Sequence, residues 1–259
     1  MIVVGCDVGA LYTKAVVLDR DRLVAARLAP TTGRADDEVG ALVAETLADA
    51  GIAPDRVDRV VATGSGAALV SRADFAEDEV HCVAAAAAFH SDDLDLVIHV
   101  GGQSATAIHL DADGEVADFS RNDKCASGSG RFLEMMAAKL GVPLTDVDAV
   151  AARATRPATL SSQCGVFAES EIISHANSGV PVPDLVAGVC AAVGGLVTAQ
   201  ARRFSAATHY TVTGGVARFA SFRDVLRARL DAAYHPYPHD PIFAAAIGAA
   251  ILGGDDGPP

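Results

Sequence analysis

One pattern occurs twice in this 259-residue chain: a short apolar strand that ends in a glycine turn and continues into a second strand. The first copy surrounds Asp7-Val8-Gly9 and the second surrounds Val100-Gly101-Gly102. A pattern that recurs at a long interval indicates an internal duplication of one folding unit. The sequence therefore predicts an α/β fold of two similar lobes, and the cleft between such lobes is a natural site for a nucleotide.

Hydrophobic periodicity extends this prediction to the whole chain. Short apolar or alternating runs predict strands at 2–6, 15–19, 23–28, 59–63, 94–100, 105–110, 116–120 and 209–213. Helical spacing predicts helices at 36–50, 81–89, 130–140, 166–175, 184–204, 219–230 and 241–252. No long Pro- or Ser-rich linker separates the halves, so we expect closely packed, hinged lobes. Residues 1–91, completed by the C-terminal helix at 241–254, are expected to form the first lobe, and residues 92–240 the second.

Composition excludes several classes of partner. The formal net charge is −13 and the pI is about 4.9, and such a surface repels nucleic acid and anionic lipid. The longest apolar run, 185–201, is rich in Gly and Ala, which favours a buried helix over a membrane span. The N-terminus has no basic region typical of a secretion signal, and the five cysteines are an odd number. We therefore expect a cytoplasmic protein with reduced thiols.

The first glycine turn contains residues that could bind a phosphate and its metal ion. Gly9 and Ala10 supply backbone N–H groups, which form an anion-binding nest in such a turn. Thr13 and Lys14 are candidate phosphate donors, and Asp7 could hold Mg²⁺ through water. Taken alone, this segment is better explained as a plain hairpin turn.

Two further turns change that balance. Gly101-Gly102-Gln103-Ser104 follows the second strand of this kind, and Gly214-Gly215-Val216-Ala217 follows a third strand and precedes a helix. The last arrangement suits close approach to an adenosine or ribose. Three strand-terminal glycine turns in this order predict a nucleotide site, although the chain has neither a Walker P-loop nor a dinucleotide-binding fingerprint.

Two cysteines have unusual surroundings. Cys125 lies in Asn122-Asp123-Lys124-Cys125-Ala126-Ser127-Gly128-Ser129-Gly130, and Cys164 lies in Ser161-Ser162-Gln163-Cys164-Gly165-Val166-Phe167. Each precedes the expected start of a helix, and neither belongs to a C-x-x-C pair. One chain thus offers two soft ligands where an iron–sulfur cluster usually needs four, and a two-fold dimer would supply the other two. The remaining cysteines, Cys6, Cys82 and Cys190, lie in apolar stretches and are predicted to be packing residues.

The order of the three turns resembles the acetate and sugar kinase–actin superfamily of two-lobed ATPases, which have duplicated ribonuclease H-like domains. Within it, segments 122–133 and 164–174 are similar to the ATP-dependent activators of 2-hydroxyacyl-CoA dehydratases and the ATP-binding subunits of benzoyl-CoA reductase. The resemblance implies ATP or ADP in the cleft, and one [4Fe–4S] cluster bound by Cys125 and Cys164 of two protomers. It also implies that ATP hydrolysis is coupled to transfer of a low-potential electron to a CoA-ester dehydratase or reductase. Ferredoxin or flavodoxin would be the upstream donor.

The chain also departs from that family's pattern. At the second turn His99 and Ser104 stand where the family usually has acidic residues, so Asp7 is the obvious remaining carboxylate for Mg²⁺. Gln103 can still orient water, and Ser104 can still donate a hydrogen bond to a phosphate oxygen. Asp7, Gln103 and Ser104 are therefore the candidate catalytic residues.

These departures leave alternatives open. The chain could form a homodimer, or a heterodimer with a related ATP-binding subunit, and its hydrolysis could be weakened. Rival functions are a small-molecule kinase of the same fold and a non-catalytic, regulatory ATP-binding subunit.

Overall fold

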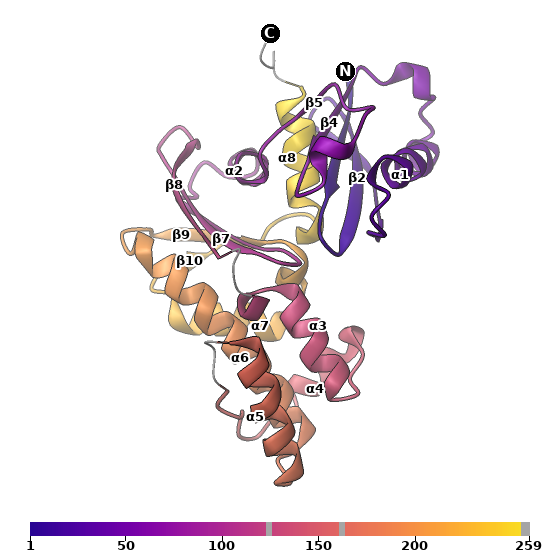
Figure 1. Cartoon of the computed structure of the whole chain (residues 1–259). Helices are drawn as coiled ribbons and strands as arrows, with labels where there is room; N and C mark the ends of the chain where they lie inside the picture. Colours follow the sequence, from indigo (N-terminus) through magenta and orange to yellow (C-terminus); the bar gives the residue numbers. More distant parts are fainter. Residues whose placement is uncertain (123–125, 161–163, 255–259) are drawn as a thin grey trace.

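The computed structural model describes residues 1–122, 126–160 and 164–254, which form two five-stranded sheets with helices on both faces (Figure 1). The first sheet has the order β3-β2-β1-β4-β5 and the second the order β10-β9-β6-β7-β8. The strands of the first sheet are β1 (Ile2–Val8), β2 (Tyr12–Asp19), β3 (Arg22–Pro30), β4 (Arg59–Thr63) and β5 (Phe75–Ala76). The strands of the second are β6 (Leu96–Val100), β7 (Ala105–Leu110), β8 (Val116–Asn122), β9 (His209–Thr213) and β10 (Ala233–Tyr234).

The two sheets have the same topology. In the first, β1 pairs antiparallel with β2 and parallel with β4; in the second, β6 pairs antiparallel with β7 and parallel with β9. We number the strands of each sheet by their order along the chain and start from the edge formed by the hairpin. Both sheets then have the spatial order third, second, first, fourth and fifth strand. The duplication predicted from the glycine turns is therefore present at the level of strand order.

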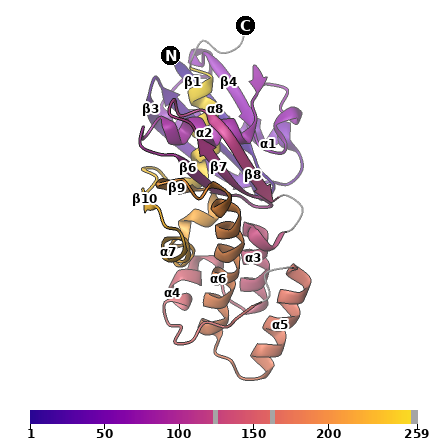
Figure 2. The ribbon, with the colours of Figure 1, turned by 90° about the vertical axis from the view of Figure 1, so that its left-hand side faces the viewer.

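Helices separate and cover the sheets (Figure 2). The helices are α1 (Ala35–Ala50), α2 (Glu79–Ala88), α3 (Gly130–Lys139), α4 (Val147–Ala151), α5 (Gly165–Asn177), α6 (Val182–Ala201), α7 (Ala220–Arg229) and α8 (Ala244–Leu252). Short 3₁₀ helices occupy Pro54–Arg56, Ala67–Leu69, Ala126–Gly128, Leu144–Asp146, Arg202–Phe204, Gly215–Arg218 and Pro241–Phe243. Helix α1 packs on one face of the first sheet and α8 on the other, while α2 packs against both α8 and the second sheet.

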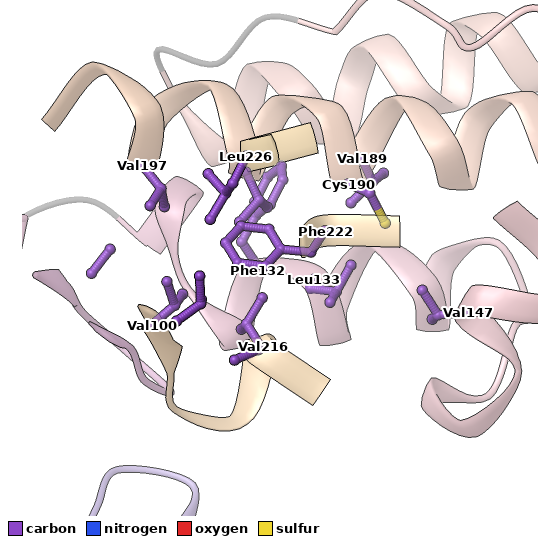
Figure 3. Close-up of a cluster of buried hydrophobic side chains, with 14 of the residues drawn as sticks. Val100, Phe132, Leu133, Val147, Val189, Cys190, Val197, Val216, Phe222 and Leu226 are labelled. Atoms are coloured by element: carbon purple, nitrogen blue, oxygen red, sulfur yellow. The ribbon is translucent and has the colours of Figure 1, made fainter. Parts of the chain in front are cut away.

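The far face of the second sheet carries the core cluster with the most buried residues, to which α3, α4, α5, α6 and α7 contribute. Phe132, Phe222 and Leu226 are buried at its centre, together with Val100 from β6 and Val197 from α6 (Figure 3). The stretch Val182–Phe204 is the one described helix that is long and apolar enough to cross a membrane by composition, and 61% of its most apolar window is buried in the protein. This agrees with the expected buried helix at 185–201.

Helix α8 approaches strand β1 and helix α2 closely at two glycines. A Cβ atom on Gly5 of β1 would overlap the carbonyl oxygen of Ala246 in α8, and one on Gly248 of α8 would overlap the carbonyl oxygen of Cys82 in α2. Because each obstructing atom belongs to the backbone of a helix, a side chain at either position forces the elements apart. The two glycines therefore set the spacing of β1, α8 and α2.

All the strands and helices predicted from periodicity are present, with ends that differ by a few residues. Prediction missed α4 and the edge strands β5 and β10, because five- and two-residue elements are too short to show a period. It also began α2 two residues too late: Asp78 caps that helix, its carboxylate accepting a hydrogen bond from Val80 N at 2.7 Å. Cys6, Cys82 and Cys190 are buried as expected, and burial raises the pKa of each thiol.

Substitution of Gly248 by Ala is expected to destabilise the protein by about 3 kcal/mol, because overpacking against a helix backbone cannot be relieved by a rotamer change. Urea denaturation measures the change. Gly195→Ala in α6 is the matched control, since its Cβ would meet mainly the mobile guanidinium of Arg229. Equal stability of Gly248→Ala and wild type would show that α2 and α8 do not depend on this contact.

Candidate functional site

The three glycine turns meet in one cavity of about 790 Å³ between the sheets. Each turn follows the carboxyl end of a central strand: β1, β6 or β9. Ligands of α/β proteins bind in the crevice outside these strand ends. Ten of the predicted residues line the cavity: Gly9, Ala10, Lys14, Gly101, Gly102, Gln103, Ser104, Gly214, Gly215 and Val216. The other three, Asp7, Thr13 and Ala217, are buried and are not part of its lining.

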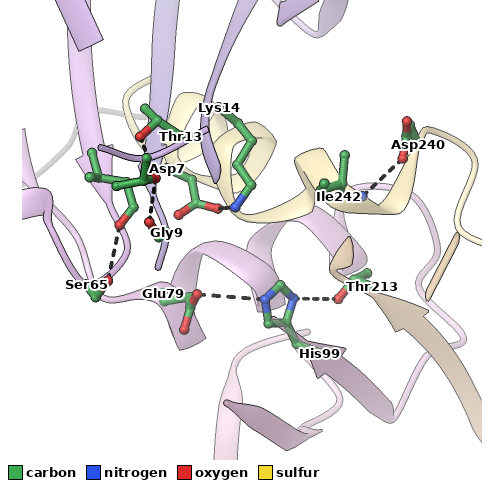
Figure 4. Close-up of polar contacts among 12 residues, drawn as sticks. Asp7, Gly9, Thr13, Lys14, Ser65, Glu79, His99, Thr213, Asp240 and Ile242 are labelled. Carbon is green, nitrogen blue, oxygen red and sulfur yellow. Dashed lines mark hydrogen bonds and ion pairs between the residues drawn. The ribbon is translucent and has the colours of Figure 1, made fainter. Parts of the chain in front are cut away.

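Asp7 and Lys14 form an ion pair in the first turn, with 2.7 Å between Nζ and Oδ2 (Figure 4). The other carboxylate oxygen, Oδ1, is buried and has no hydrogen-bond partner in the described part of the chain. Burial raises the pKa of Asp7, and the charge of Lys14 opposes that effect. A buried oxygen without a partner suits a bound cation or a water of its hydration shell. The hydroxyl of Thr13, which the sequence predicted as a phosphate donor, lies 3.0 Å from the hydroxyl of Thr31 and is hydrogen-bonded to it.

A fourth turn, which the sequence did not predict as part of the site, adjoins Asp7. Gly64 and Ser65 follow β4, the parallel neighbour of β1, and both line the cavity. Gly64 has a φ of +86°, and a Cβ there would collide with Oδ1 of Asp7. The sequence Thr63-Gly64-Ser65-Gly66 could have indicated that this turn belongs to the site, because it too is a glycine turn at the end of a strand.

The second group of unpredicted residues surrounds His99. Its Nδ1 lies 3.0 Å from the hydroxyl of Thr213, and its Nε2 lies 3.8 Å from Oε1 of Glu79 (Figure 4). The opposite oxygen of Glu79 accepts a 2.7 Å hydrogen bond from Arg121. Glu79, Arg121 and His99 all line the cavity next to the second turn. Proximity of α2 to the second sheet brings them together, which no local pattern reveals.

The protonation state of His99 follows from its surroundings. It is 4% exposed, and burial lowers its pKa to about 4, although Asp7 opposes the shift. The ring is therefore neutral at pH 7. A neutral ring carries one proton, and placing it on Nε2 directs an N–H toward the Glu79 carboxylate, while Nδ1 accepts from Thr213. The alternative tautomer would direct a lone pair at the carboxylate.

The other end of the cavity is more apolar. Val216, Phe219, Leu144 and Ile242 line it, and the Arg218 guanidinium pairs there with Asp240, with 2.8 Å between Nε and Oδ1. Such a mixture of apolar walls and a few oriented polar groups is typical of small-molecule sites.

Helix α3 is tied directly to the second turn. Its first N–H groups, those of Gly130 and Arg131, donate to the carbonyl oxygens of Gly101 and Gly102, each at 2.9 Å. The first N–H groups of a helix have no partner inside the helix. Here two of them are satisfied by the second turn, which connects the turn directly to the start of α3. The second turn and the first residues of α3 are therefore hydrogen-bonded directly to each other.

The described residues of the two cysteine segments lie near the start of α3. Cys125 falls outside the described residues, whereas Cys164 is half-buried and immediately precedes α5, as predicted. A Cβ on Gly165 would lie 3.6 Å from the hydroxyl of Ser127, two residues after Cys125. Within the described ranges, no group of three or more His, Cys, Asp or Glu side chains is arranged to hold a metal. Val166 and Phe167, next to Cys164, are 70% and 65% exposed.

Comparison with known proteins assigns the chain to a family. A model of the BadF/BadG/BcrA/BcrD ATPase family matches residues 4–253. The chain belongs to this family. It is 33% identical to the (R)-2-hydroxyglutaryl-CoA dehydratase activating ATPase of Acidaminococcus fermentans, over 95% of both chains. It is 30% identical to a benzoyl-CoA reductase subunit of Thauera aromatica, over 80% of this chain and 75% of that relative.

Solved structures agree with this assignment. The activator of the 2-hydroxyisocaproyl-CoA dehydratase from Clostridium difficile, with bound ADPNP, superimposes with a TM-score of 0.93 at 30% identity. The match covers 99% of this chain and 95% of that one. The expected fold class, a two-lobed actin-like ATPase, is confirmed.

The unfolding free energy is expected to fall as the pH decreases from 6.5 to 4. In this window unfolded His99 binds a proton that the folded state excludes, which costs up to about 3 kcal/mol at pH 4. His99→Gln lacks this contribution, so its stability relative to wild type should improve on acidification. Urea denaturation at several pH values measures both proteins. His81→Gln, on the exposed surface of α2, is the control. If the unfolding free energies of wild type and His99→Gln change with pH in the same way, folded His99 does not have a lowered pKa.

Proposed function

We propose that this protein is an ATP-hydrolysing activator that passes a low-potential electron from a shared iron–sulfur cluster to a CoA-ester dehydratase or reductase. Two kinds of support converge. The chain is similar over nearly its full length to activators of such enzymes. The α3 N-terminus also donates hydrogen bonds to the second glycine turn, which links the nucleotide cavity to a cysteine segment. This link is the observation that carries the proposal.

ATP would lie across the cavity with its phosphates between the first and second turns. The backbone N–H groups of Ala10 and Gly102, together with Lys14, would bind phosphate oxygens. The N–H groups of Gly9 and Gly101 donate to the carbonyl oxygens of Tyr12 and Ser104, so these two glycines would shape the phosphate-binding turns. The third turn, at Gly214, Gly215, Val216 and Ala217, would hold the adenosine. The apolar walls beside that turn are consistent with a nucleobase.

Asp7 would hold Mg²⁺ through water, and its unpartnered Oδ1 fits that role. Gln103 and Ser104, both on the cavity wall, would orient water and donate to a phosphate oxygen. Thr13 has its hydroxyl bonded to Thr31, so we assign it to holding the turn in place rather than to phosphate.

Cys125 and Cys164 from each of two protomers would ligate the cluster. Cys164 is the N-cap residue of α5, where the helix dipole favours an anionic group such as the cluster. When bound, a [4Fe–4S] cluster supplies one-electron reducing power at low potential. The protomers could be identical or related ATP-binding subunits, and a cytoplasmic ferredoxin or flavodoxin would reduce the cluster.

Cys164→Ser is expected to abolish binding of a cluster, which should amount to about four irons per wild-type dimer from ligand count. Iron determination and visible absorption of anaerobically purified protein measure this. Cys190→Ala, which removes a thiol buried in the α6 core, is the control and should keep its iron. A colourless, iron-free wild type that phosphorylates a sugar would instead support the rival kinase function.

Asp7→Asn is expected to lower Mg²⁺-dependent ATP hydrolysis by about 100-fold, because the substitution removes the carboxylate charge that holds the ion. A phosphate-release assay at varied Mg²⁺ concentration measures the loss. Asp118→Asn, which breaks an exposed ion pair with Arg203, should hydrolyse ATP as wild type does. Unchanged hydrolysis in Asp7→Asn would remove Asp7 from the metal site.

A further inference from the structure

The first glycine turn is held from behind by a threonine that lies 22 residues further along the chain. Thr31 directly follows β3 and makes two hydrogen bonds to the turn. Its hydroxyl donates to the carbonyl oxygen of Gly9 at 2.8 Å, and its backbone N–H donates to the carbonyl oxygen of Leu11 at 2.9 Å. These carbonyl groups lie on either side of Ala10. Gly9, Ala10 and Leu11 line the nucleotide cavity, whereas Thr31 is not part of the lining.

The hydroxyl of Thr31 sets the direction of the Ala10 N–H. The carbonyl of Gly9 and the N–H of Ala10 belong to one peptide unit, which is planar and trans, so the two groups point in opposite directions. The carbonyl oxygen points to Thr31, which lies outside the cavity lining. The N–H of Ala10 therefore points the other way, into the cavity. A side chain that touches no ligand thus orients a group that we assign to phosphate binding.

The hydrogen bonds behind the turn have a defined direction, because each hydroxyl has a single proton to donate. Thr31 gives its proton to Gly9, so Thr13 is the donor in the 3.0 Å contact between the Thr13 and Thr31 hydroxyls. Thr13 is buried, and its hydroxyl also lies 3.5 Å from Oε2 of Glu38. Donation from Thr13 satisfies a lone pair of the Thr31 hydroxyl and leaves its proton for the Gly9 carbonyl.

The segment that carries Thr31 is fixed on both sides. Before it, β3 pairs with β2, and Pro30 lies opposite Tyr12. After it, the Glu38 carboxylate in the first turns of α1 accepts hydrogen bonds from the backbone N–H groups of Thr32, at 2.8 Å, and Arg34, at 3.0 Å. The position of the Thr31 hydroxyl is therefore set by the packing of α1 and β3 rather than by the glycine turn itself.

The second glycine turn has the same plan with a different donor. The carbonyl oxygen of Gly101 accepts a 2.9 Å hydrogen bond from the N–H of Gly130, the first residue of α3. The N–H of Gly102, in the same peptide unit, points opposite to that carbonyl. A backbone N–H thus holds the second turn, whereas a single hydroxyl holds the equivalent carbonyl of the first. One substitution can remove that hydroxyl.

We propose that Thr31 is a positioning residue of the phosphate site: its hydroxyl holds the peptide unit of Gly9 and Ala10 so that the Ala10 N–H faces the phosphates of ATP or ADP. This inference rests on the nucleotide binding proposed above. Without the hydroxyl, the peptide unit is free to rotate and to turn the negative end of its carbonyl toward the phosphates. Thr31 itself touches neither the nucleotide nor a metal ion.

The test compares two substitutions at Thr31. Thr31→Val keeps the shape of the side chain and removes the hydroxyl, whereas Thr31→Ser keeps the hydroxyl. We expect Thr31→Val to raise the dissociation constant of ADP by about 10-fold, since it weakens a hydrogen bond to a charged group, and Thr31→Ser to stay within about twofold of wild type. The affinity for adenosine, which has no phosphate, should be unchanged in both variants. Titration calorimetry measures ADP binding, and competition against ADP measures adenosine binding.

Two further variants complete the test. Thr31→Ala removes the same hydroxyl by truncation and is expected to bind ADP as weakly as Thr31→Val, so it serves if the valine is not tolerated. Thr211→Val is the matched control, because it makes the same change at a buried hydroxyl of β9 that has no hydrogen-bond partner among the described residues. We expect it to bind ADP as wild type does.

The possible outcomes separate the two proposals. Wild-type ADP affinity in Thr31→Val and Thr31→Ala, or equal losses in Thr31→Val and Thr31→Ser, would overturn the positioning role while leaving nucleotide binding intact. Equal losses of ADP and adenosine affinity would also overturn it, because they would show a general disturbance of the cavity. A wild-type protein that binds neither ATP nor ADP would overturn both proposals.

Discussion

The arrangement of the molecule depends on two places where helix and strand backbones touch with no side chain between them. At Gly5 the first sheet meets α8, and at Gly248 α8 meets α2. Because α8 and α2 are held this close to β1, the other face of α2 is free to pack on the second sheet through Val80, Val83 and Ala87. One helix thereby belongs to both halves of the duplicated fold, and its first turn enters the nucleotide cavity.

Three ion pairs lie in or beside the cavity of this acidic chain. Lys14 neutralises Asp7, Arg121 neutralises Glu79, and Arg218 neutralises Asp240. Buried carboxylates without such partners would be expensive and would repel an anionic ligand. The Asp7–Lys14 pair leaves one buried oxygen of Asp7 without a hydrogen bond among the described residues. Our proposal for the metal ion depends on this oxygen of Asp7.

The contact between the second turn and α3 gives the proposed coupling a physical basis. Two backbone hydrogen bonds, from Gly130 and Arg131 to Gly101 and Gly102, connect the place where phosphate would bind to the helix that follows a cysteine segment. Close-packed interiors transmit small displacements rather than absorbing them. The exposed Val166 and Phe167 beside Cys164 place an apolar surface next to the proposed cluster ligand, where a second protomer would bury it.

The amino-acid sequence by itself determined the repeated strand–turn–strand units, the longer helices and strands, and ten of the residues that line the cavity. These are local properties: periodicity is set within a few residues, and a glycine turn after a strand can be recognised without its neighbours. Only the tertiary structure decided that Glu79, Arg121 and His99 share a site. They come from α2, β8 and β6, and their contact results from how α2 packs between the lobes. It likewise decided that Thr13 bonds to Thr31, because a strand's pairing determines which way each side chain points.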